Sequence, residues 1–140
     1  MPRFVSHALV LFCASLPIGA CGDGTSAPTS PTPSIPASMT EIFAGEINRN
    51  GAKTHMFLAQ ASGTVTATLD TLEPEATAAI GLSLGTWNGS ACQIVIANDN
   101  AAQGASVIGA ASSAGNLCVR VYDIGKVDNL ASYQLTVVHP

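Results

Sequence analysis

Short stretches of alternating apolar and polar residues fill the chain from residue 41 onward. The alternation is clear over residues 63–71, where Val65 and Leu69 share one face and Asp70 lies on the other. A period of two residues is typical of half-buried antiparallel strands. Similar runs occupy residues 117–122, 132–138, 42–47, 53–60, 79–87, 92–97 and 105–111. About eight short strands predict an all-β fold, a single antiparallel β-sandwich.

Clusters of turn-forming residues separate these runs. They are rich in Asn, Gly, Ser and Asp and lie at 48–51, 61–63, 88–90, 98–100 and 115–116. At Glu73–Ala76, a proline near the start favours one short helical turn. Longer helices are disfavoured, because only 10% of the residues are charged and small and β-branched residues abound.

The first 20 residues have the order of a secretory signal peptide. Arg3 gives a short positive region, and residues 4–16 form an apolar run that is shorter than the about 20 residues of a membrane span. The run leads to Ile18-Gly19-Ala20-Cys21, which resembles the lipobox of bacterial lipoproteins. The resemblance implies cleavage before Cys21 and a diacylglyceryl group on its sulfur, a membrane anchor. An ordinary secretory signal with a chance cysteine is the alternative.

Residues 21–40 form a linker rich in Pro, Ser and Thr. Its four prolines and scarce apolar surface predict a disordered, extended stalk between the lipid and the folded domain of residues 41–140. In bacteria with two membranes, Asp directly after the lipidated Cys often marks retention at the inner membrane. Gly22 stands at that place, which favours the outer membrane. The expected location is therefore the bacterial cell envelope.

The charge of the chain argues against a nucleic-acid partner. Five basic and nine acidic residues give a net charge of −4, and the basic residues are scattered. Nucleic-acid binding needs a stripe of Lys and Arg that neutralises phosphates. The expected partners are the membrane, through the lipid on Cys21, and an envelope protein or polysaccharide.

Residues 81–85 spell Gly-x-Ser-x-Gly, the pattern of the serine nucleophile in many hydrolases. A nucleophile elbow needs a sharp turn from a strand into a helix, and a histidine and an acid that activate the serine. Here the alternation continues across Ser83, and Asn88-Gly89 ends the strand without a helix. We therefore expect a strand serine and no enzyme activity; a small hydrolase is the alternative.

No cofactor and no metal site are expected. His55 and His139 lack the spacing of zinc ligands and would need at least one further ligand. Oxygen-rich loops at 98–100 and 123–128 have the chemistry of a calcium site, but such residues are more often turn formers.

Cys92 and Cys118 are expected to form a disulfide, because the export signal implies an oxidising compartment. The alternation of side chains along the strands complicates this pairing. It places Cys118 on the same face as Arg120 and Tyr122, whereas it places Cys92 on the same face as Ile94. A disulfide between these faces would need a strand end, a bulge or adjacent strand edges. Two free buried thiols are the alternative.

Trp87 and Tyr122 are the candidate ligand-binding residues. Trp87 continues the small, polar face of its strand, and Tyr122 from another strand is a possible neighbour. An exposed aromatic ring beside Gly and Ser can stack on a sugar or on a partner side chain. The alternative is a Trp that covers the edge of the core near a turn.

Three segments resemble the bacterial pre-peptidase C-terminal domain: GEINRNGAKTHMFLAQASGTVTATLD, AGNLCVRVYDIG and YQLTVVHP. The turn and apolar positions that match are Gly45, Phe57, Gly63, Val65, Leu69, Ala114, Gly115, Val119, Val121, Tyr133, Leu135 and Val137. The resemblance implies a jelly-roll-like sandwich that is a non-catalytic appendage, usually beside secreted proteases. Some members bind calcium through an Asp-rich stretch at the central strand; here residues 79–84 fill that place without a carboxylate.

These observations together predict a membrane-anchored bacterial lipoprotein that displays a non-catalytic accessory or interaction domain. The alternative is a carbohydrate- or protein-binding module that uses an exposed aromatic face around Trp87.

Overall fold

The computed structural model describes residues 37–76 and 78–140. Predictions about the signal peptide, Cys21 and most of the linker lie outside these residues. Within these residues there are eight strands: β1 (Met39–Asn48), β2 (Ala52–Ala59), β3 (Gly63–Glu73), β4 (Ile80–Trp87), β5 (Cys92–Ala101), β6 (Ser106–Ala111), β7 (Gly115–Tyr122) and β8 (Leu130–His139).

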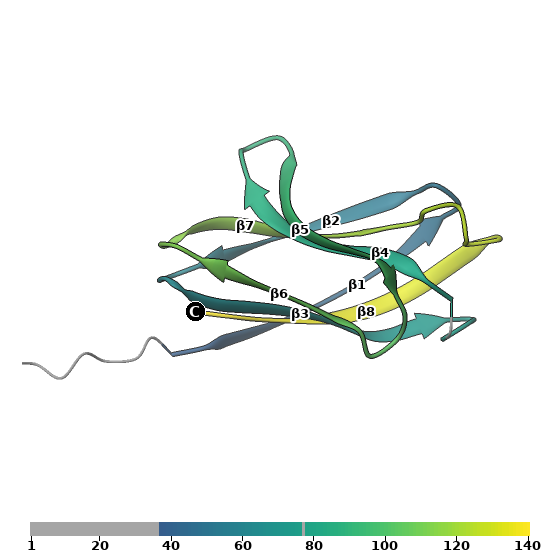
Figure 1. The fold of residues 1–140 in the computed structure, drawn as a ribbon, viewed down its shortest axis with the longest axis horizontal. Helices are drawn as coiled ribbons and strands as arrows, with labels where there is room; N and C mark the ends of the chain where they lie inside the picture. Colours follow the sequence, from purple (N-terminus) through teal and green to yellow (C-terminus); the bar gives the residue numbers. More distant parts are fainter. Residues whose placement is uncertain (1–36, 77) are drawn as a thin grey trace, which may run out of the picture. The chain divides into compact units, whose positions relative to one another are not determined.

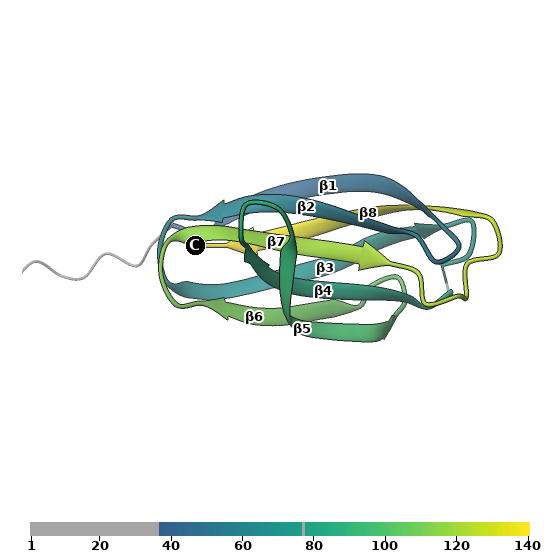
Figure 2. The ribbon, with the colours of Figure 1, turned by 90° about the horizontal axis from the view of Figure 1, so that it is seen from above.

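The strands form two four-stranded sheets that pack face to face (Figures 1 and 2). The first sheet has the order β1-β8-β3-β6 and the second has the order β2-β7-β4-β5. All neighbouring strands are antiparallel. This order is that of an eight-stranded jelly roll, in which successive strands alternate between the sheets except at the β4–β5 hairpin. The predicted all-β, jelly-roll-like sandwich is confirmed.

The core lies between the sheets and follows the alternation of the sequence. Val65 and Leu69 of β3 are buried, as are Leu135 and Val137 of β8. Leu69 lies directly opposite Leu135 in the β3–β8 ladder, so the two strands bury the same face. Burial of such apolar side chains between two sheets is the main favourable contribution to a fold of this kind.

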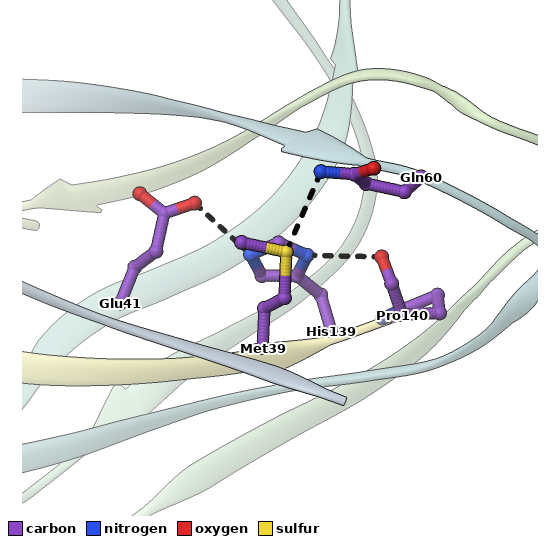
Figure 3. Close-up of polar contacts among 5 residues, drawn as sticks. All are labelled: Met39, Glu41, Gln60, His139 and Pro140. Atoms are coloured by element: carbon purple, nitrogen blue, oxygen red, sulfur yellow. Dashed lines mark hydrogen bonds and ion pairs between the residues drawn. The ribbon is translucent and has the colours of Figure 1, made fainter. Parts of the chain in front are cut away.

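The last residues of the chain close the end of the sandwich at which β1 begins (Figure 3). His139 is fully buried, and its Nε2 lies 3.0 Å from Oε1 of Glu41 on β1. The His139 ring also packs against Phe57 of β2, with 5.0 Å between centroids. The backbone N–H of Gln60 donates to the Pro140 carbonyl at 2.8 Å. These contacts tie the end of β8 to β1 in its own sheet and to β2 in the other sheet.

Three local predictions are wrong. Residues 115–116 do not form a turn, because β7 begins at Gly115. Residues 73–76 do not form a helical turn: β3 runs through Glu73, and a tight turn follows in which the Ala78 N–H donates to the Glu75 carbonyl at 3.0 Å. Residues 98–100 do not end a strand, because β5 continues to Ala101. The β4–β5 ladder shifts register in this region, so the extra polar residues are accommodated as an irregularity within the strand.

Candidate functional site

A disulfide joins two strands that are not neighbours. Cys92 is the first residue of β5 and Cys118 lies in β7, with β4 between these strands. Next-nearest strands in a regular sheet are about 9.5 Å apart, since each spacing is about 4.8 Å. The Cα atoms of Cys92 and Cys118 are only 5.8 Å apart. The tip of the β4–β5 hairpin must therefore leave the plane of the sheet, and Figure 1 shows it rising above the sheet.

The predicted disulfide is thus confirmed, and its geometry resolves the parity conflict. Cys92 stands at a strand end, and the β4–β5 ladder has a register shift between Leu84 and Gly85. A strand end and a bulge were both expected as ways to bring Cys92 and Cys118 together. A Cβ atom on Gly85 would lie 2.1 Å from the Gln93 carbonyl oxygen, so the strands cross here at a distance that only glycine permits.

The raised hairpin forms one wall of a hollow on the outer face of the second sheet. We name it the Trp87 hollow. It has a volume of about 330 Å³ and is lined by Met56, Phe57, Leu58, Trp87 and Asn116. The β2–β7 register places Met56 opposite Cys118 and Leu58 opposite Asn116, so the floor of the hollow continues directly from the disulfide.

Large apolar side chains are exposed in the Trp87 hollow. Met56 is 54% exposed and Leu58 is 51% exposed, although both lie within a strand. The Asn116 amide and the indole N–H of Trp87 are the side-chain hydrogen-bonding groups among these lining residues, and none of the residues is charged. The hollow can therefore bind through apolar contact and a small number of hydrogen bonds, and its lining offers no nucleophile or general base.

Tyr122 does not belong to this site, so the expected proximity of Trp87 and Tyr122 is wrong. Tyr122 lies opposite Gly81 at the start of β4, whereas Trp87 ends that strand. The Tyr122 ring lies over Gly81 and its hydroxyl donates to the Asp99 carboxylate. Burial and this carboxylate raise the pKa of Tyr122 to about 12. The side chain acts as a brace between β7, β4 and β5.

Ser83 lies within β4, as expected for a strand serine. It is fully buried, and its hydroxyl donates to the Arg120 carbonyl of β7 at 3.3 Å. Neither histidine of the described residues contacts it: His55 bonds Tyr133 and His139 bonds Glu41.

Each histidine is held in its own cluster between the sheets. The His55 Nε2 shares a 2.7 Å hydrogen bond with the Tyr133 hydroxyl, and the His55 ring stacks on Phe43 with 4.9 Å between centroids. Burial, and secondarily the charge of Lys53, lowers the pKa of His55. Residues 37–76 and 78–140 contain no group of three His, Cys, Asp or Glu side chains that could hold a metal ion.

The loop at 123–128 is organised by its own carboxylate. Asp123 accepts hydrogen bonds from four backbone N–H groups, those of Asn50, Gly125, Lys126 and Val127. Desolvation alone would raise the pKa of Asp123, but the four donors outweigh it and the pKa is lowered. The Asp123 carboxylate is therefore used to build a turn.

Met56, Leu58 and Asn116 were not predicted as site residues. Met56-Phe57-Leu58 is a run of three large apolar residues inside an otherwise alternating strand, and that break was the available signal. Asn116 looked like a turn residue, but it belongs to β7.

Comparisons of the sequence with protein-family models and with curated proteins found no match. Within the part of the chain that the structure describes, no helix is long and apolar enough to cross a membrane.

Proposed function

We propose that this chain is a bacterial lipoprotein, anchored in the cell envelope by a lipid on Cys21, whose β-sandwich is a non-catalytic interaction domain. The lipobox-like residues 18–21 support the anchor, and the Pro-rich linker supports display at a distance from the lipid. The resemblance to pre-peptidase C-terminal domains supports an accessory role.

The observation that carries the interaction function is the uncharged Trp87 hollow. Trp and Met are enriched where proteins bind each other, and a flexible Met side chain adapts to a partner surface. A saccharide site usually places several polar groups around an aromatic ring, whereas the Asn116 amide is the one polar group that accompanies the Trp87 indole in this lining. We therefore assign the hollow an apolar, uncharged segment of an envelope protein as its partner.

In-cell photo-cross-linking tests this assignment. A photoreactive amino acid at Met56 should give an adduct with one envelope protein, identified by mass spectrometry. The control position is Ile42, which is 65% exposed on the first sheet and lies outside the hollow. With the identified protein purified, Trp87→Ala should weaken binding about tenfold or more, because buried aromatic residues dominate interfaces. Val95→Ala, exposed outside the hollow, should leave the affinity unchanged.

Two results would contradict the assignment. Adducts of equal yield from Met56 and Ile42 would mean that the Trp87 hollow is not a preferred contact. A saturable change of Trp87 fluorescence with a neutral cell-wall polysaccharide, without any protein adduct, would replace the protein partner with a carbohydrate.

A further inference from the structure

We propose that the Cys92–Cys118 disulfide controls the Trp87 hollow: it holds the β4–β5 hairpin in its raised position, and its reduction releases Trp87 from the wall. The biological meaning of this control rests on the proposed function, because the hollow is the proposed contact surface. The structural change itself needs no partner and is measured without one.

The tip of the hairpin is joined to β7 through the disulfide. The β4–β7 ladder ends at Thr86 opposite Leu117, and Trp87 pairs across the hairpin with Cys92. Among the described residues, no loop or side-chain hydrogen bond links the turn residues 88–91 to β7. Beyond Thr86, the bond to Cys118 is therefore the covalent connection between the tip and β7.

The tip is organised internally and can move as a unit. The Asn88 side-chain oxygen accepts from the backbone N–H groups of Ser90 and Ala91, at 3.0 Å and 2.8 Å. The Asn88 N–H in turn donates to the Ala91 carbonyl at 3.2 Å. These bonds are made within the tip, so they survive when the link to β7 is broken.

The apolar core cluster between the sheets is separate from the disulfide. The core cluster is formed by buried residues of both sheets, such as Leu69, Leu82 and Leu135, and Cys92 and Cys118 are not part of it. Reduction should therefore loosen the hairpin tip and leave the two-sheet body intact.

The chemical step is a thiol–disulfide exchange with a dithiol reductant. A thiolate of the reductant attacks Sγ of Cys92, which is half-buried, whereas Cys118 is fully buried. The S–S bond breaks, and Cys118 leaves as a thiolate that takes up a proton. The second thiol of the reductant then displaces Cys92 and closes the reductant's own disulfide, so two electrons pass to the protein.

The experiment compares the oxidised protein with the same protein reduced by dithiothreitol. Trp87 is the single Trp of the chain, so its fluorescence reports on the wall of the hollow. On reduction, the acrylamide quenching constant should rise about twofold or more and the emission should shift to the red. A Cys92→Ser/Cys118→Ser variant should show the same values with and without dithiothreitol.

Hydrogen exchange separates local opening from general unfolding. The amides of residues 86–93 should lose protection on reduction, while those of β8 keep it. Simultaneous loss of protection in both regions would show that the disulfide holds the whole sandwich, and would overturn the proposal. Unchanged quenching and protection after complete reduction would overturn it as well. Neither readout involves a partner, so a failure of the proposed function leaves this test valid.

Discussion

At the scale of single residues, glycines and aromatic rings are matched across strands. A Cβ atom on Gly81 would collide with the Tyr122 ring, and a Cβ atom on Gly45 would collide with the Tyr133 side chain. Both tyrosines also form hydrogen bonds to a further strand through their hydroxyls, Tyr122 to Asp99 and Tyr133 to His55.

Alternation in a sequence gives the face of a side chain but not its neighbour. For that reason Tyr122 could be placed on the outer face and still be wrongly paired with Trp87.

Gly85 is the residue on which the crossing of β4 and β5 depends. Gly85→Ala should lower the free energy of unfolding by about 1–3 kcal/mol, because the added Cβ meets the backbone of Gln93 and cannot be relieved by a side-chain rotation. Urea denaturation measures the change. Gly115→Ala is the matched control, since a Cβ at Gly115 meets nothing within 4 Å. Equal stability of the two variants would contradict the crossing.

His55 makes the stability of the sandwich depend on pH. Burial and Lys53 lower the pKa of His55 from its usual 6.5, so the unfolded chain takes up a proton more readily than the folded one. The stability that neutral His55 contributes to the fold is fully present above about pH 6.5 and is lost as the pH falls towards the lowered pKa of His55. The urea midpoint should fall between pH 7.5 and pH 5, and less so in His55→Gln, which retains a hydrogen-bonding group for Tyr133. The same pH dependence in both proteins would show that His55 is not responsible.

At the scale of elements, alternation predicted burial best where one face of a strand is buried, as in β3 and β8. In contrast, β4 is buried on both faces over most of its length, and β5 is largely exposed. Each of the eight alternating runs corresponds to one strand, and in β3 and β8 the predicted inner residues are buried. The errors at 73–76 and 98–100 have a common cause. Residues that often form turns and caps also fit strand ends and bulges, and tertiary pairing decides between these states.

The β7–β8 loop should depend on one carboxylate. Asp123→Ala removes the acceptor of four backbone N–H groups and should lower the free energy of unfolding by about 2–3 kcal/mol. Asp128→Ala, exposed on the same loop, should cost little. Thermal or urea unfolding distinguishes the two. Because the pKa of Asp123 is lowered, the difference should persist at neutral pH and shrink below about pH 4, where the carboxyl of the unfolded chain takes up a proton before that of the folded protein does.

At the scale of the whole molecule, periodicity predicts two packed sheets but not the order of their strands. The jelly-roll order was expected only from the resemblance to pre-peptidase C-terminal domains, and the structure has it. The Trp87 hollow could not be assembled from the sequence, because β2, β4 and β7 meet there through pairings distant along the chain. Trp87 could be recognised from the sequence as a candidate binding residue. Its neighbours Met56 and Leu58 could be identified only from the β2–β7 register.

We propose that a lipid on Cys21 holds the sandwich, and with it the Trp87 hollow, at a membrane. The intact mass of the mature protein extracted from membranes tests this anchor. We predict an N-terminus at Cys21 and a mass that exceeds that of residues 21–140 by a diacylglyceryl group, with or without an added N-acyl chain. A mature N-terminus at another residue, or a mass without any fatty modification, would show that Cys21 is not a lipid anchor.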